Sequence, residues 1–111
     1  MVAFPREIDE MNAAQVHLRE AWLKREASAG TFKRLHEERI RTLWSRAVEC
    51  ARAVLDWRLH SIDSGVTKYV HKGAMEVEKG ILTRTTPEEV VAAGLGKDFA
   101  ELVAFCQGGE A

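Results

Sequence analysis

Apolar residues near the start of the chain recur at intervals of three and four positions. They are Ile8, Met11, Ala14, Leu18, Ala21 and Trp22. That spacing places them on one face of an α-helix. The pattern predicts a helix over about residues 5–28 that begins at Pro5, where proline is tolerated, and ends at the Ser-Ala-Gly sequence of residues 28–30.

A second and longer helix is predicted over about residues 31–62, with Thr31 as its N-cap. Its apolar residues cover a wide arc: Ile40, Leu43, Trp44, Ala47, Val48, Cys50, Ala51, Val54, Leu55 and Trp57. Only a narrow stripe of the helix is polar. A helix of this kind usually packs against more than one neighbour. We therefore expect it to be the central helix of the domain or to take part in an oligomer.

Residues 66–80 fit two patterns. Val66, Val70, Ala74 and Val77 have helical spacing, and we favour a helix. The same stretch also alternates with period two, which leaves open a short hairpin that turns at Lys72 and Gly73.

The last part of the chain begins with a helix-start signal. Thr86 as N-cap, Pro87 at the first position and Glu89 at the third form a capping box. The helix is predicted to end near Gly94, and a final helix runs from Lys97 to Cys106. The fold class predicted is therefore all-α: a single small helical-bundle domain over residues 1–111, built on a long antiparallel helical hairpin with shorter C-terminal helices.

The composition adds a charge layout to this architecture. The chain has 111 residues and a formal net charge of -1, so no strong field toward nucleic acid follows from the total. The small net charge arises because a basic segment and an acidic segment cancel. Residues 31–58 contain seven basic and four acidic side chains, whereas residues 86–111 contain one basic and five acidic ones. The middle of the chain is basic and its end is acidic.

The basic residues of the second helix allow two interpretations. A stripe of Arg34, Arg41, Arg46 and Arg52 would suit phosphate contacts. The alternative is a solvated or protein-facing surface, in which arginines pair with acids three or four residues away. The predicted pairs are Arg34–Glu38, Glu37–Arg41, Glu38–Arg41 and Glu49–Arg52. We favour the second interpretation because most of these arginines have such an acid.

Catalytic and metal-binding patterns are weak. Cys50 falls in mid-helix and Cys106 at a helix end, settings that oppose thiolate formation, and we expect both to be reduced. Asp56 and His60 share a helix face, but a structural zinc usually has four ligands. A helix-turn-helix over residues 86–105, with Gly94 in the turn, would offer phosphates few donors. We expect no enzyme activity, no metal and no cofactor.

The width of the apolar arc is the main indication of function. We expect a non-enzymatic protein–protein interaction module, either an assembly or adaptor subunit or a small inhibitor of a larger complex, which self-associates through the second helix as a homodimer or binds another protein. The predicted interface residues are Trp57, Trp44, Leu43, Val54 and Cys50. Trp57 is the best candidate for an exposed anchor, whereas a core position explains Trp44 better. The alternative is a nucleic-acid-binding accessory protein that uses the four arginines. No signal peptide or membrane span is evident, so a cytoplasmic location is expected.

Overall fold

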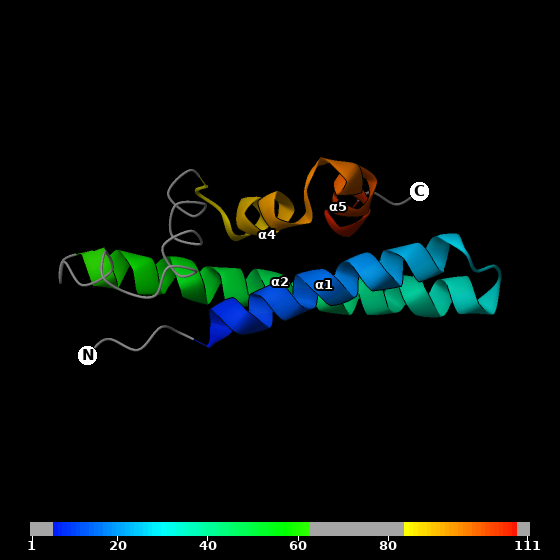
Figure 1. The fold of residues 1–111 in the computed structure, drawn as a ribbon, viewed down its shortest axis with the longest axis horizontal. Coiled ribbons are helices and arrows are strands. Elements are labelled where there is room, and N and C mark those ends of the chain that lie inside the picture. The colour runs from blue at the N-terminus through cyan, green and yellow to red at the C-terminus, as the bar shows by residue number, and fades with distance from the viewer. Residues whose placement is uncertain (1–5, 63–83, 109–111) are drawn as a thin grey trace.

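The computed structural model describes residues 6–62 and 84–108, and of residues 58–62 it describes only the backbone. Two long helices, α1 (Glu7–Glu26) and α2 (Thr31–Ile62), run antiparallel (Figure 1). They are followed by α4 (Pro87–Leu95), the short 3₁₀ helix η2 (Lys97–Phe99) and α5 (Ala100–Cys106). All regular structure in these two ranges is helical, which confirms the all-α class and the antiparallel hairpin. Residues 66–80, for which helix and hairpin were both considered, lie outside the described residues.

The turn between α1 and α2 falls where the sequence indicated it. The amide of Ala27 donates to the carbonyl of Leu23, and Ser28 Oγ donates to the carbonyl of Lys24 at 2.7 Å. Gly30 has φ 61°, a left-handed conformation that favours glycine. Its carbonyl accepts the amide of Arg34, so Gly30 caps α2 and Thr31, the predicted N-cap, is instead the first helical residue.

One hydrophobic core joins the hairpin to the C-terminal helices. Its members are Ile8, Met11, Ala14, Leu18, Ala21, Trp22, Ile40, Trp44, Ala47, Cys50, Ala51, Val54, Val90, Val91, Leu95, Leu102 and Phe105. The C-terminal helices lie along one side of the hairpin, with α4 packed against both α1 and α2 (Figure 1). The wide apolar arc of α2 is thus covered from two directions by the chain itself.

The capping box predicted before α4 is present in modified form. Thr86 Oγ1 accepts the backbone amide of Glu89 at 3.2 Å. The Glu89 carboxylate accepts the hydroxyl groups of Thr85 and Thr86, each at 3.1 Å, rather than a backbone amide. The first turn of α4 is therefore capped by a small hydroxyl–carboxylate network.

The end of α4 differs from the prediction. Gly94 lies inside the helix, and Gly96, with φ 78°, ends it two residues later. Gln15 Nε2 donates to the carbonyl of Val91 at 3.2 Å, and Arg19 donates to the carbonyl of Gly94. Polar side chains of α1 thus satisfy carbonyl oxygens at the C-terminal end of α4. Because Gly94 is helical, it cannot serve as the turn of the helix-turn-helix considered for residues 86–105.

Candidate functional site

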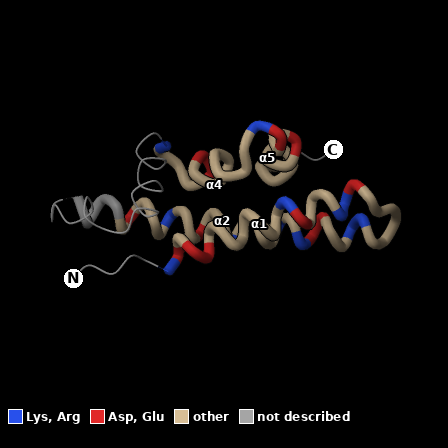
Figure 2. The backbone as a smooth tube through the Cα atoms, viewed as in Figure 1, with Lys and Arg blue, Asp and Glu red and all other residues tan. Residues whose placement is uncertain are grey.

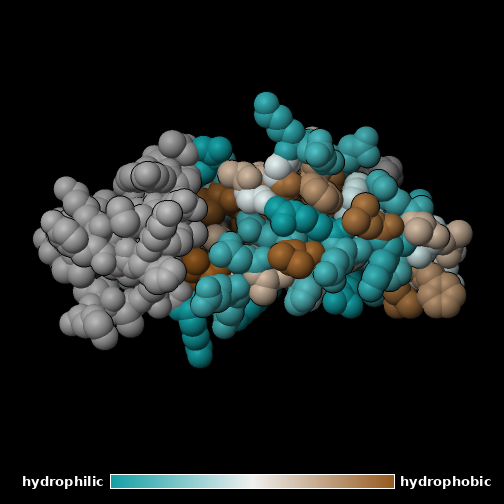
Figure 3. Space-filling model, in the orientation of Figure 1, coloured by the Kyte–Doolittle hydropathy of each residue, from teal (hydrophilic) through white to brown (hydrophobic). Residues whose placement is uncertain are grey.

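Large apolar side chains are exposed around the turn of the hairpin. Phe32 is 70% exposed, Leu23 is 59% exposed and Leu35 is 54% exposed. Leu23 lies in the last turn of α1, and Phe32 and Leu35 lie in the first two turns of α2. Apolar surface is visible at this end of the molecule in Figure 3. Single exposed apolar residues are ordinary, but three large ones grouped at one end indicate a contact surface.

The phase of α2 explains why two of these residues point outward. Its buried positions are Ile40, Trp44, Ala47, Ala51 and Val54. Extending that spacing backward leads to Glu37 and Lys33, so the apolar Phe32 and Leu35 fall off the core face. The apolar arc predicted from the sequence began at Ile40 and included neither Phe32 nor Leu35. The available signal was their mismatch with the core phase.

Three cations lie close to these apolar residues in the chain, and the exposed acids Glu26 and Glu38 lie near the same turn. Lys24, Lys33 and Arg34 are all exposed, and basic positions flank the turn on both helices (Figure 2). None of the three forms an ion pair with a residue that the structure describes. We call the following six residues the hairpin apex: Leu23, Lys24, Phe32, Lys33, Arg34 and Leu35.

Arginine and aromatic side chains join α5 to the turn half of the hairpin. The guanidinium carbons of Arg25 and Arg41 lie 5.3 Å and 4.4 Å from the centre of the Phe105 ring. The rings of Trp22 and Phe105 are 6.0 Å apart and tilted by 56°. Arg25 also lies 3.9 Å from Glu37 across the hairpin. These contacts hold α5 against both long helices, next to the hairpin apex.

The interface residues predicted from the sequence lie mostly inside the molecule. Trp44 is 7% exposed, Cys50 is 2% exposed and Val54 is fully buried, so these three pack within the chain. Leu43 and Trp57 are partly buried. The arc was wide because α1, α4 and α5 all pack against the core that it helps to form.

The four predicted arginines do not form one free stripe. Arg46 pairs with Glu10 on α1 and with Glu49 one turn along α2. Arg41 lies over the Phe105 ring, whereas Arg34 and Arg52 are exposed. Two of the four are thus engaged within the chain.

The local ion pairs predicted along α2 are absent among the described residues. None of Arg34–Glu38, Glu37–Arg41, Glu38–Arg41 and Glu49–Arg52 is formed. Glu37 reaches across the hairpin to Arg25 instead, and Glu49 pairs with Arg46. Glu37 thus joins the two long helices, Glu49 pairs with a different arginine of α2, and Glu38 forms no ion pair with a described residue.

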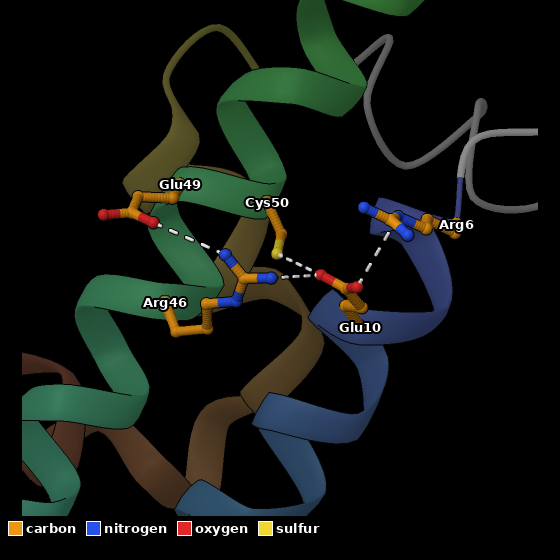
Figure 4. Close-up of polar contacts among 5 residues, drawn as sticks. All are labelled: Arg6, Glu10, Arg46, Glu49 and Cys50. Carbon is orange, nitrogen blue, oxygen red and sulfur yellow. Dashed lines mark hydrogen bonds and ion pairs between the residues drawn. The ribbon is translucent and has the colours of Figure 1, made fainter.

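Toward the other end of the hairpin, the Glu10 carboxylate contacts two arginines and one thiol (Figure 4). The carboxylate pairs with Arg46 and lies 3.9 Å from Arg6, and Cys50 Sγ donates to it at 3.7 Å. Burial and then the Glu10 carboxylate raise the pKa of the Cys50 thiol, while Arg46 opposes the shift. Burial raises the pKa of Cys106 to about 12, against the opposing influence of Arg41. Both cysteines are free thiols, in settings that disfavour the thiolate, as predicted.

Other candidate chemistry is sparse. Among residues 6–62 and 84–108, no three His, Cys, Asp or Glu side chains are grouped to hold a metal ion. Asp56 is exposed, and the side chain of His60, its predicted neighbour on the helix face, lies outside the described residues. A shallow depression of about 460 Å³ lies along α4 and is lined by Arg84, Glu89, Ala92, Ala93, Gly96 and Lys97. No helix in the described part of the chain is long and apolar enough to cross a membrane.

Comparison of the chain with models of protein families, with curated proteins and with solved structures finds no match. The hairpin apex is the most distinctive surface among the described residues.

Proposed function

We propose that the protein is a helical-hairpin module that binds another protein through the hairpin apex, as an adaptor or assembly subunit or as a small inhibitor of a larger complex. The observation that supports this function is the exposure of Phe32, Leu23 and Leu35, between 54% and 70%, at one end of the hairpin. Burying a large apolar side chain contributes about 1.5–3 kcal/mol. Three such residues near one turn supply enough apolar surface for the energetic centre of a protein interface.

The apex replaces most of the surface that the sequence indicated. Self-association through α2 was predicted because its apolar arc exceeds what one short helix covers, and the chain's own helices cover much of that arc. Leu43 and Trp57 remain partly exposed and could support a secondary contact with a second copy. The main contact in the proposed function is made by the apex.

Site-specific photo-crosslinking in cells of the native host tests the proposal. Benzoylphenylalanine at position 32 is compared with the same group at position 16, because Val16 is also exposed and apolar, at 46%, but lies on α1 two turns before Leu23. We expect a discrete protein adduct from position 32 and none from position 16. An adduct of twice the mass of the chain would indicate self-association at the apex.

A substitution experiment complements the crosslinking. The double variant Phe32→Gln/Leu35→Gln should lose the adduct formed from a crosslinker at position 23. Its free energy of unfolding should stay within about 0.5 kcal/mol of the wild-type value, because both side chains are on the surface. Equal adducts from positions 16 and 32, or no adduct from position 32, would show that the apex is not the binding surface.

A further inference from the structure

We infer that the partner bound at the hairpin apex presents an acidic amphipathic helix, an inference that rests on the proposed function. The apolar side chains of the apex alternate with cations along the chain. Lys24 follows Leu23, and Lys33 and Arg34 separate Phe32 from Leu35. A complementary ligand must therefore supply apolar groups and negative charge at the same time.

The cations of the apex are available for a partner. The structure contains paired arginines elsewhere, since Arg25 lies 3.9 Å from Glu37 and Arg46 pairs with Glu10. Lys24, Lys33 and Arg34, by contrast, are exposed and form no ion pair with any described residue. Their charges are not neutralised by the fold.

A helix is the element that best matches the spacing of the apolar groups. Phe32 and Leu35 are three residues apart on α2, so they lie on one face of that helix, with Leu23 at the end of the antiparallel α1. An amphipathic helix laid across this end offers an apolar stripe, and acidic residues at the borders of the stripe would meet the lysines and Arg34.

Two other occupants fit less well. A second copy docked apex to apex would bring Lys24, Lys33 and Arg34 against the same three cations. Nucleic acid would use the cations, but it would leave the two leucines without a role. An acidic helix uses both the cations and the apolar groups.

Binding of two synthetic helical peptides tests the inference. Both carry the same leucine stripe and a fluorescent label; glutamates border the stripe in one peptide and lysines in the other. Fluorescence anisotropy with the full chain should show at least a tenfold tighter Kd for the glutamate peptide, and that preference should weaken at high salt. Equal affinity for the two peptides, or a preference for the lysine peptide, would overturn the inference.

Charge reversal at the apex provides the matched variant. Lys33→Glu/Arg34→Glu should bind the lysine peptide better than the glutamate peptide, whereas Arg52→Glu, an exposed reversal further along α2, should keep the wild-type preference. Far-ultraviolet circular dichroism checks that each variant remains helical. An unchanged preference in the double reversal would contradict the assignment to the apex.

A labelled single-stranded oligonucleotide serves as the competing probe. We expect it to bind at least tenfold more weakly than the glutamate peptide and to be insensitive to Phe32→Gln/Leu35→Gln. Tighter binding of the oligonucleotide, lost on the double reversal, would replace the acidic helix by nucleic acid. If the glutamate peptide fails to bind while crosslinking at position 32 still succeeds, the inferred partner class is wrong and the proposed function stands; if both fail, both are wrong.

Discussion

The side-chain amide of Gln15 occupies the space that a side chain at residue 94 would need. A Cβ on Gly94 would overlap the Gln15 amide, which is held in place by its hydrogen bond to the Val91 carbonyl at 3.2 Å. Gln15 is only 6% exposed and is the one polar residue counted in the described part of the core. Glycine within a helix normally costs stability, so its presence at position 94 reflects this close approach between α1 and α4.

Gly94→Ala tests that contact. Alanine favours the helix by up to about 1 kcal/mol, yet we expect a net loss of about 1–3 kcal/mol because the methyl group displaces Gln15. Urea unfolding followed by circular dichroism measures the change. Ala93→Gly on the exposed neighbour is the control, and it should cost no more than about 1 kcal/mol. A Gly94→Ala variant as stable as the wild type would show that the Gln15 side chain moves aside without loss and does not account for the glycine.

The cap of α4 gives a second prediction. Thr86→Ala removes the acceptor of the Glu89 backbone amide and should lower the free energy of unfolding by about 1 kcal/mol. Thr85→Ala is the matched control because it removes only a hydroxyl bond to the Glu89 carboxylate, and its effect should be smaller. Equal losses in the two variants would mean that the backbone cap is not the stabilising contact.

The ring of Phe105 gives a third prediction. Phe105→Leu keeps an apolar side chain but removes the ring face against which Arg25 and Arg41 lie, and we expect it to cost about 1–3 kcal/mol. A double-mutant cycle with Arg41→Met should give a coupling of about 0.5–1 kcal/mol, whereas a cycle with Arg52→Met should give none. Coupling as large with Arg52 as with Arg41 would refute the cation–π contact.

The thiols give a prediction for alkaline pH. The pKa of Cys106 is raised by burial to about 12, so its protonated form is preferred in the folded state. The stability that this preference provides is complete below the ordinary thiol pKa of about 9, and it is lost as the pH rises toward the folded value. We expect the difference in urea midpoint between the wild type and Cys106→Ala to become smaller as the pH is raised from about 8 to about 10.5.

Thiol labelling provides an independent check on the same group. At neutral pH, native Cys106 should react with iodoacetamide about 1000-fold more slowly than after unfolding, because so little thiolate is present. Native Cys50 should also be slow, since burial raises its pKa in the same direction. Rapid labelling of either cysteine in the native state would contradict the buried environment that the structure gives them.

The sequence by itself determined the local elements. The three- and four-residue spacing from Ile8 to Trp22 specified α1, and the glycine at position 30 and the Thr86–Pro87 signal marked helix boundaries close to those observed. These features depend on contacts between residues near one another in the chain, and periodicity and capping report such contacts directly.

Only the tertiary structure decided which residues face a partner. The apolar arc of Trp44 and Val54 suited either core packing or an oligomer, and the structure buries both residues within the chain. Phe32 and Leu35 lie off the core phase of the helix and are exposed. Likewise, Glu37 could pair locally or across the hairpin, and the antiparallel register selected Arg25. Whether an apolar or charged side chain is used within the fold or left for binding depends on neighbours distant in sequence, which a single helix pattern does not encode.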